Sequence, residues 1–396
     1  MIKAVLLDLD NTLLHSDERQ LVGEYMRLIE AFLQRLWGES GLSEVLRDAV
    51  HNLTQQRDAQ TTNNDLILER LSLAVGHEPD AIRAAFTDFF TAYYPSLKRC
   101  TEQVPGAVEA VERIRARDLA LVIATNPVYP AEAIRQRLEW AGLPASLDTY
   151  TLVTTADNMH FVKPDPAYYA EVVARVGVEP DEAVVVGDSL ANDVLPAASV
   201  RLRTFHIGGS AHSTIADGAG TLADFVEQLT EEHWGEDLPP PAMKPEAVEP
   251  QLWGNVGALF GMLADIQPSY WMQHPDPNEW SIIQIVCHLL ESEDAVQRPR
   301  LQRILDEDNP FLTNPPPPPG PQSPPCLSDG LEAARRFANR RQETIALLRS
   351  LPAAAWDRPA RHSVFGLTTL LEMALFTAQH DRLHLNQLCQ TLGRCK

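Results

Sequence analysis

Two carboxylates stand two positions apart near the start of the chain, directly after an apolar run. The run covers residues 2–7, contains one lysine, and indicates a buried strand of a parallel sheet. Asp8 and Asp10 would then emerge together at the carboxyl end of that strand, the edge where open α/β sheets bind ligands. A strand that simply ends in a polar turn gives the same local pattern, so the pair alone does not decide its own role.

Further polar residues stand at matching places later in the chain. Thr125 and Asn126 follow a second predicted strand, Lys163 precedes a predicted helix, and Asp188 and Asp193 follow a third predicted strand. Each has an ordinary interpretation as part of a turn, a loop or a strand exit. Together they suit phosphoryl transfer, because a threonine can hold a phosphoryl oxygen, a lysine can neutralise charge and two aspartates can complete a cation site.

This chemistry sets a requirement for charge. A carboxylate does not approach a phosphate dianion unless a hard cation and a cationic side chain offset the repulsion. Mg²⁺ meets that requirement with a few carboxylates, waters and phosphate oxygens. In this scheme Asp8 attacks the phosphorus atom and Asp10 carries a proton.

Predicted strands and helices alternate around these residues. That alternation predicts right-handed crossovers and a Rossmann-like parallel sheet covered on both faces. Beyond the opening strand, the predicted strands are 119–124, 150–154, 183–186 and 204–207, and the predicted helices are 104–117, 130–141, 166–176 and 222–229.

A block without strands interrupts this pattern. From about residue 17 to residue 94, apolar residues recur at helical spacing between charged faces, which predicts about four helices. The block lies between one predicted strand and the next, so it is expected to form an inserted lid over the end of the sheet.

The order of the polar motifs resembles a known family. D-x-D-N-T-L, a strand ending in T-N, K-P before a helix, and G-D-S-x-x-N-D after a strand resemble the four motifs of the haloacid dehalogenase superfamily of phosphohydrolases. The resemblance covers about residues 1–230, with a core at 1–14 and 100–230 and a helical cap at about 15–99. It implies that Asp8 is the nucleophile and Asp10 the general acid and base. Dehalogenases of this superfamily lack the second acid, so Asp10 favours hydrolysis of phosphate esters.

The same resemblance assigns roles to the remaining residues. Thr125 and Asn126 would bind the transferring phosphoryl group, and Lys163 would hold both the nucleophile and the phosphate. Mg²⁺ would be bound by Asp8, the backbone carbonyl of Asp10 and Asp188. Asp193 would either bind the metal directly or contact one of its ligands.

The chain changes character after residue 230. Residues 231–250 are rich in proline and acidic residues, which predicts a linker. Residues 251–396 contain predicted helices at 252–266, 281–305, 331–351 and 367–392, which favour an all-α four-helix bundle. The segment Pro315–Pro319 lies in a long proline-rich stretch, interpreted either as a mobile loop or as a ligand for proline-binding domains.

Three histidines are the candidates for chemistry in this bundle. His380 and His384 share one helix face, and His288 lies on the second predicted helix; satisfied core histidines would look the same. W-S-I-I-Q-I-V-C-H-L followed by a late H-x-x-x-H resembles the DinB/YfiT-like family, although Gln284 stands where that family often has an acid. The resemblance implies a three-histidine site for a divalent metal such as Zn, Ni, Mn or Fe. Known members include thiol transferases, metal-dependent hydrolases and proteins without an assigned activity.

Composition limits the partners. A net charge of -21 and the lack of any long Lys/Arg cluster argue against nucleic acid. No apolar run approaches the length of a membrane span, and the five cysteines show no pairing pattern, so we expect a cytoplasmic protein with reduced thiols. The cysteines are Cys100, Cys287, Cys326, Cys389 and Cys395.

These observations favour a Mg²⁺-dependent phosphomonoester hydrolase, acting on a small phosphorylated metabolite and fused to a metal-binding bundle. Two alternatives stay open. The bundle is either the main enzyme, as a metal-dependent thiol transferase or hydrolase, or a module for binding or homodimerisation without chemistry. The motifs do not report the substrate, because in this family the cap determines specificity.

Overall fold

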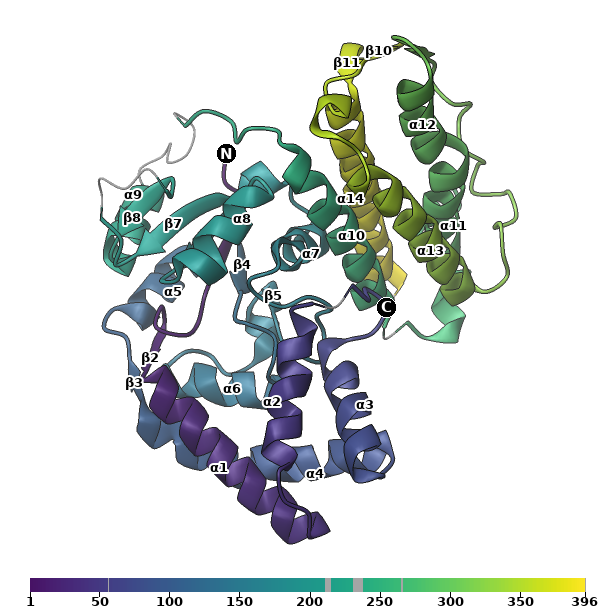
Figure 1. Ribbon diagram of the computed structural model, residues 1–396. Helices are drawn as coiled ribbons and strands as arrows, with labels where there is room; N and C mark the ends of the chain where they lie inside the picture. The colour runs from purple at the N-terminus through teal and green to yellow at the C-terminus, as the bar shows by residue number, and fades with distance from the viewer. Residues whose placement is uncertain (56, 211–214, 231–237, 265, 396) are drawn as a thin grey trace. The chain divides into compact units, whose positions relative to one another are not determined.

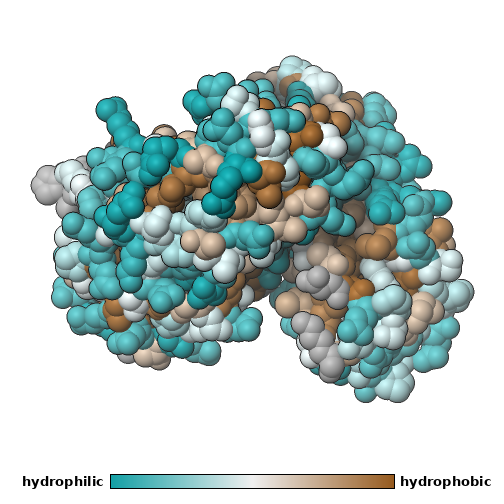
Figure 2. Space-filling model, turned by 90° about the horizontal axis from the view of Figure 1, so that it is seen from below, coloured by the Kyte–Doolittle hydropathy of each residue, from teal (hydrophilic) through white to brown (hydrophobic). Residues whose placement is uncertain are grey.

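The computed structural model describes residues 1–55, 57–210, 215–230, 238–264 and 266–395. Contacts divide the chain into two compact units, residues 1–168 with 180–241, and residues 169–179 with 242–396. Hydrophilic residues cover most of the face shown in Figure 2, and hydrophobic residues appear there in scattered groups. Among the described residues, every helix is too short or too polar to span a bilayer.

A parallel sheet forms the centre of the first unit (Figure 1). Its described strands, in spatial order, are β5 (Leu152–Val153), β4 (Ala120–Ile123), β1 (Ala4–Leu7), β6 (Ala183–Gly187), β7 (Arg203–Ile207) and β8 (Gly218–Gly220). Each neighbouring pair is parallel, and β1 is fully buried between β4 and β6. The predicted parallel α/β sheet is confirmed, and its central strand is the one that ends at the paired aspartates.

Helices follow the strands as the alternation predicted, and most begin and end within about three residues of the expected positions. Their buried faces carry small or aliphatic side chains, as in the first helix after the inserted block, where Ala107, Val111 and Ile114 are buried. These helices are α5 (Ala107–Arg115), α6 (Ala131–Trp140), α8 (Leu195–Ser199) and α9 (Leu222–Thr230).

The inserted block has the predicted helices. Asp17 and Thr62 cap two of them, accepting hydrogen bonds from the backbone N–H groups of Gln20 (3.1 Å) and Asp65 (3.2 Å). The rings of Tyr25 and Phe89 meet edge to face at 5.9 Å in its core. An antiparallel pair of short strands, β2 and β3, connects the block to the sheet. The elements are β2 (Leu14–Ser16), α1 (Glu18–Trp37), α2 (Leu42–Leu53), α3 (Asn63–Val75), α4 (Pro79–Ala92) and β3 (Thr101–Gln103).

The second unit is mainly helical, as predicted. A π-helical turn at Glu293–Gln297 joins two helices that the sequence suggested as one, and a small sheet that was not predicted accompanies the bundle. The helices are α7 (Pro166–Val176, from residue 169 on), α10 (Val248–Leu263), α11 (Ile282–Ser292), α12 (Arg298–Asp306), α13 (Gly330–Arg349) and α14 (Leu370–Cys395). The strands are β9 (Phe311–Leu312), β10 (Pro359–His362) and β11 (Gly366–Thr369).

Helix α7 groups with the bundle from residue 169 on, although the sequence pattern predicts it as part of the first domain. Gly254 of α10 explains the close packing, since a Cβ there would lie 2.5 Å from the backbone nitrogen of Glu171 and 2.6 Å from Cβ of Ala170. The predicted domain boundaries stay a prediction. Part of the predicted linker, residues 231–237, lies outside the described residues, and α10 already begins at Val248.

The last helix begins three residues later than predicted, because residues 367–369 belong to β11. Thr369 and Glu372 form a reciprocal cap: the Thr369 hydroxyl accepts from the Glu372 N–H (3.3 Å), and Glu372 Oε2 accepts from the Thr369 N–H (2.8 Å). This T-x-x-E signal stands in the sequence and fixes the start at Leu370.

Buried charges hold the bundle helices together. Arg341 of α13 is fully buried and donates to Glu293 (2.7 Å) and to Asp381 of α14 (2.5 Å). Glu293 also accepts from the Thr344 hydroxyl. Since a buried charge without its partner is strongly destabilising, loss of any member of this network should destabilise the bundle.

The expectation that all cysteines are reduced thiols is wrong for one pair. A disulfide joins Cys287 of α11 to Cys326, and Cys100, Cys389 and Cys395 are free. The partners are 39 residues apart in the sequence, so no short spacing pattern announces them. The proline-rich stretch that precedes Cys326 is irregular, as predicted, and side chains of the bundle hold it: Trp280 donates to the Pro319 carbonyl (3.0 Å) and Gln284 to the Ser323 carbonyl (2.8 Å).

Candidate functional site

The structure brings the polar residues of the first unit to one edge of the sheet. Asp8 follows β1 and its backbone N–H donates to the Val186 carbonyl of β6 (2.9 Å), so the nucleophile candidate is fixed at the carboxyl end of a central strand. The chain then turns at Asn11, which has a φ of 60° and whose backbone N–H donates to the Leu14 carbonyl (2.8 Å). This turn presents Asp10 next to the exit of the strand, as the D-x-D spacing predicted.

Lys163 links two of the carboxylates. Its ammonium lies 2.8 Å from Asp8 and 2.6 Å from Asp193, and all three side chains are almost fully buried. Asn126 positions the lysine backbone, since its side-chain oxygen accepts from the Lys163 N–H (3.2 Å). Residues 155 positions apart in sequence thereby become ion-pair partners, an arrangement that the motif order alone could only suggest.

Three carboxylates gather beside this lysine. Oxygen atoms of Asp8, Asp188 and Asp193 lie within 4.8 Å of one another. The Ser189 N–H donates to Asp193 (3.1 Å), and Gly187 leaves the necessary space, because a Cβ there would lie 2.3 Å from an Asp193 oxygen. Hard oxygen donors at this spacing fit Mg²⁺, which prefers carboxylates and water.

Burial sets the electrostatics of the nucleophile candidate. It raises the pKa of Asp8 to about 7, and the carboxylates of Asp193 and Asp188 act in the same direction, while Lys163 opposes the shift. A divalent cation beside Asp8 would favour its charged form. A cation held by this donor set would therefore increase the ionised fraction of the nucleophile candidate.

The predicted phosphate-binding residue Thr125 is fully buried at the end of β4. Its hydroxyl has no hydrogen-bond partner within the described residues, although its backbone carbonyl accepts from Tyr168 (3.0 Å) and Thr154 (2.7 Å). A buried hydroxyl without a partner is costly unless a ligand satisfies it. A phosphoryl oxygen would do so.

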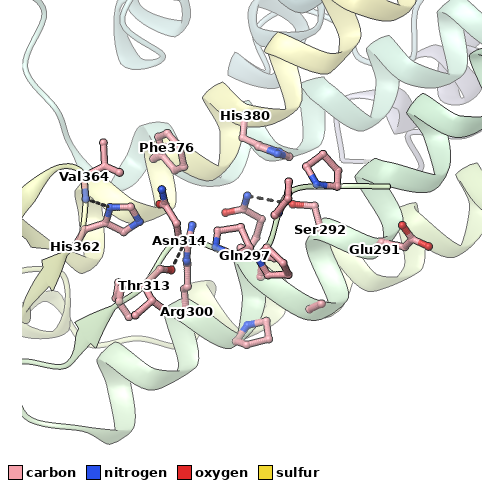
Figure 3. A pocket seen from close by; sticks show the side chains of 18 of the residues that line it. Glu291, Ser292, Gln297, Arg300, Thr313, Asn314, His362, Val364, Phe376 and His380 are labelled. Carbon is pink, nitrogen blue, oxygen red and sulfur yellow. Dashed lines mark hydrogen bonds between the residues drawn. The ribbon is translucent and has the colours of Figure 1, made fainter. Parts of the chain in front are cut away.

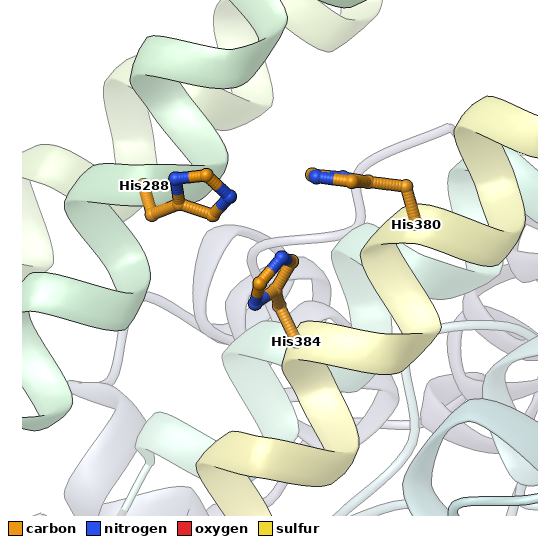
Figure 4. Close-up of side chains that lie close together, drawn as sticks. All are labelled: His288, His380 and His384. Atoms are coloured by element: carbon orange, nitrogen blue, oxygen red, sulfur yellow. The ribbon is translucent and has the colours of Figure 1, made fainter. Parts of the chain in front are cut away.

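The three histidines of the second unit also come together (Figure 4). His288 points from α11 toward His380 and His384 of α14, and a nitrogen of each ring lies within 4.8 Å of the others. The ring centroids of His288 and His384 are 4.4 Å apart. Three imidazoles from two helices form a donor set that fits a divalent transition metal.

Neighbouring groups suit metal binding by these rings. Gln387 lies 3.0 Å from Nδ1 of His384, the position where an outer partner orients a ligating histidine, whereas Asp381 lies 3.8 Å from Nδ1 of His380, beyond hydrogen-bond distance. Burial is the main factor that lowers the pKa of His288 to about 3 and of His384 to about 4, and the adjacent histidines add to it. These two rings are therefore neutral near pH 7, which is the form that binds metals.

Comparison with known proteins agrees with this geometry. The family model of the haloacid dehalogenase-like hydrolases matches residues 2–201. The chain belongs to the haloacid dehalogenase-like hydrolases. Among curated relatives, it is 31% identical to a phosphoglycolate phosphatase of Rhodospirillum rubrum over 58% of this chain and 90% of that protein. It is 28% identical to a glyceraldehyde 3-phosphate phosphatase of Methanopyrus kandleri over 52% of this chain and 84% of that protein.

Two further comparisons concern the second unit and the fold. Residues 251–388 match the family model of the DinB superfamily, so the predicted fusion of a hydrolase with a DinB-like region is confirmed. A solved 2-haloacid dehalogenase from Pseudomonas syringae is 21% identical, covers 59% of this chain and all of its own, and superposes with a TM-score of 0.42.

The hydrolase unit contains a site residue that the sequence did not reveal. Arg137 of α6 is almost fully buried, and its guanidinium contacts the carboxylate of Asp10 and lies 5.4 Å from the ring centre of Tyr129. Burial lowers the pKa of Arg137 to about 10, and Asp8 opposes the shift. No motif marks this arginine, because it lies on a helix that otherwise follows the usual amphipathic pattern.

A cavity of about 310 Å³ adjoins Asp10 and Arg137 in the hydrolase unit. We call it the cap chamber, because helices α1 to α4 supply most of its walls. Those walls are largely apolar, and the cap helices also contribute the polar residues Arg47 and Asn64 to the lining. The lining includes Asp10, Leu21, Tyr25, Met26, Leu46, Val50, Ile67, Phe86, Phe90, Asn126, Tyr129 and Arg137.

Proposed function

We propose that the hydrolase unit is a Mg²⁺-dependent phosphomonoesterase that acts through an aspartyl-phosphate. The observation that carries this proposal is the double contact of Lys163 with Asp8 and Asp193 beside a third carboxylate. The arrangement offers a nucleophile, a fixed positive charge and a hard-cation donor set at one point. The phosphatase relatives support the same reaction class.

The reaction divides between the two aspartates. Asp8 forms a bond to phosphorus as the ester bond breaks, and Asp10 gives its proton to the leaving alkoxide. Asp10 then takes a proton from water, which attacks the aspartyl-phosphate and releases inorganic phosphate. Lys163, Thr125 and Asn126 would hold the phosphoryl oxygens during both steps. Asp8, Asp188, Asp193 and the Asp10 carbonyl would hold Mg²⁺, which would supply charge neutralisation for the phosphoryl group.

Phosphate release from a phosphomonoester, with and without Mg²⁺, tests this proposal. We expect hydrolysis of a generic substrate such as phosphoglycolate to fall at least about a hundredfold on addition of a chelator and to return with excess Mg²⁺, because the metal neutralises the phosphoryl group and the nucleophile. Activity that survives complete chelation would remove the metal from the proposal.

The cap chamber suggests that the protein selects its substrate by the leaving group of the phosphate ester. Its walls are mostly apolar, so a leaving group with a hydrocarbon body would bury surface there. In the series from ethyl to hexyl phosphate the leaving alkoxides are chemically alike. We therefore expect kcat/KM to rise about fourfold for each methylene that the chamber buries.

A narrowed chamber provides the control for that series. Val50 lines the chamber, whereas Leu73 of α3 is 84% exposed and does not. Val50→Trp should reduce kcat/KM for hexyl phosphate and leave kcat/KM for ethyl phosphate unchanged. Leu73→Trp should leave kcat/KM unchanged for both substrates. A series without any dependence on chain length would show that the chamber does not hold the leaving group.

We also propose that the DinB-like unit binds a divalent transition metal through His288, His380 and His384. The convergence of the three rings, together with the neutral state of His288 and His384 near pH 7, supports this second site. Such a centre would polarise a bound substrate or activate a thiol or water, so the unit is proposed as a second enzyme of the chain. A binding or homodimerisation module without metal is the competing interpretation.

A further inference from the structure

The DinB-like unit contains a second feature, a cavity of about 580 Å³ (Figure 3). Two of the clustered histidines, His288 and His380, are part of its wall. We call it the bundle cavity. Cavities of this size bind small organic molecules, and the polar groups in the wall then decide which ones.

Arg300 is one such group. It is only 9% exposed, and its guanidinium makes one hydrogen bond, from Nη2 to the Thr313 carbonyl (2.8 Å). Among the described residues no carboxylate lies within ion-pair distance of it, in contrast to Arg341 of the same unit, which has two acidic partners. A guanidinium has five N–H donors, so most of the donors of this buried cation are left for a ligand.

His362 supplies a second donor in the wall of the same cavity. Its Nδ1 accepts from the N–H groups of Val364 (3.1 Å) and Phe365 (3.4 Å), which places the ring hydrogen of the neutral form on Nε2. That Nε2 atom is buried and has no partner within the described part of the chain. Burial, with the charge of Arg300, lowers the pKa of His362, so the ring stays a neutral donor.

Most of the remaining surface of the wall is apolar, although Glu291, Gln297 and Asn314 also line the cavity. Pro316, Pro317, Phe365 and Phe376 line the cavity, and Figure 3 shows Arg300, His362 and Phe376 around it. Arg300 carries a positive charge without an acidic partner among the described residues, and His362 adds an unpartnered N–H, so together they favour an acceptor with negative charge. Apolar walls require a hydrocarbon or aromatic body on the same molecule.

We propose that the bundle cavity binds an organic anion, a carboxylate or sulfonate carried on an apolar body. The anion accepts from Arg300 and His362, and the body packs against the prolines and phenylalanines. Since His288 and His380 belong to the same wall, the bound molecule lies next to the three-histidine cluster. The proposal does not depend on phosphatase activity or on which metal the histidines bind.

Two matched fluorescent probes test the proposal on the full-length protein. 8-Anilinonaphthalene-1-sulfonate carries the anion, and N-phenyl-1-naphthylamine has the same aromatic body without it. Arg300→Met should weaken binding of the sulfonate probe at least about tenfold and leave the neutral probe within about twofold, because only the charged hydrogen bonds are lost. Arg298→Met removes a more exposed arginine of the same helix, paired with Glu343, and serves as the control.

A rim position keeps the test valid if Arg300→Met fails to fold. Val364 lines the cavity and is 63% exposed, so substitutions there should be tolerated. Val364→Glu should bind the sulfonate probe several-fold more weakly than Val364→Gln does, because only the glutamate adds negative charge. Equal affinities in these two variants, or an equal loss in Arg298→Met and Arg300→Met, would overturn the proposal.

Discussion

Asp8→Asn should lower phosphomonoesterase turnover by at least about a thousandfold, because an amide cannot form the aspartyl-phosphate. The substitution preserves the size of a side chain that is nearly buried, and Lys163 keeps Asp193 as its ion-pair partner. The loss should therefore appear in kcat and not in the folded structure. Release of inorganic phosphate at saturating substrate and Mg²⁺ measures it.

Asp181→Asn is the matched control, since it makes the same change at an acid just before β6, away from the carboxylate cluster. It should retain activity within about twofold. Melting temperature and circular dichroism should agree between the two variants and the parent protein. If Asp8→Asn kept a tenth or more of the parent activity, Asp8 would not be the nucleophile.

The residues that the sequence suggested for the hydrolase site lie together in the structure because strand ends fix their positions. The pattern of β1 places Asp8 at the sheet edge, and parallel neighbours bring Thr125 and Asp188 to the same edge. Parallel strands in this order bring these side chains to the carboxyl edge of the sheet, where open α/β sheets bind ligands. The geometry then adds the distances, such as that from Lys163 to Asp193, which no spacing rule provides.

Residues that act from helix faces were not predictable in the same way. Arg137 and Arg300 each occupy a position on an amphipathic helix where an exposed arginine would look identical in sequence. Only packing shows that both are buried, one against Asp10 and the other without an acidic partner among the described residues. Burial of a charge depends on the whole fold, whereas the local pattern reports only the periodicity of one element.

Two polar residues of the bundle, Gln284 and Thr369, cap helices. Gln284, which departs from the acid common at its position in the family, caps α11 by accepting from the Ser281 N–H (2.9 Å). It also holds the proline-rich segment through its hydrogen bond to the Ser323 carbonyl. Thr369 similarly starts α14. Both follow the S/T-x-x-E/Q rule, so this part of the boundary information was present in the sequence.

The disulfide between Cys287 and Cys326 could not be predicted from the sequence for a different reason. Pairing of Cys287 with Cys326 depends on how an irregular segment of the chain returns to α11, and irregular segments carry no periodicity from which a path can be inferred. Composition led to the expectation of reduced thiols. The fold placed two of them in contact, next in sequence to His288.

Replacing both His380 and His384 by Ala should abolish binding of a transition metal by the DinB-like unit. The nitrogens of the three imidazoles lie within 4.8 Å of one another, and only that of His288 would remain. Loss of an outer partner of a metal ligand already costs roughly 10- to 100-fold in affinity, so loss of two ligands should exceed that range. Metal content of the purified protein and titration with Zn²⁺ and Ni²⁺ measure the effect.

The control for this variant is His274→Ala. His274 is a histidine of the same unit outside the cluster, and its ring contacts the Glu279 carbonyl. It should retain the parent metal content, and both proteins should keep phosphatase activity with Mg²⁺, because the residues of that site lie in the other unit. A transition-metal content that is unchanged in the double variant would exclude the three-histidine site. The bundle would then be better explained as a binding or dimerisation module, since its remaining polar groups, such as Arg300, can hold a ligand without a metal.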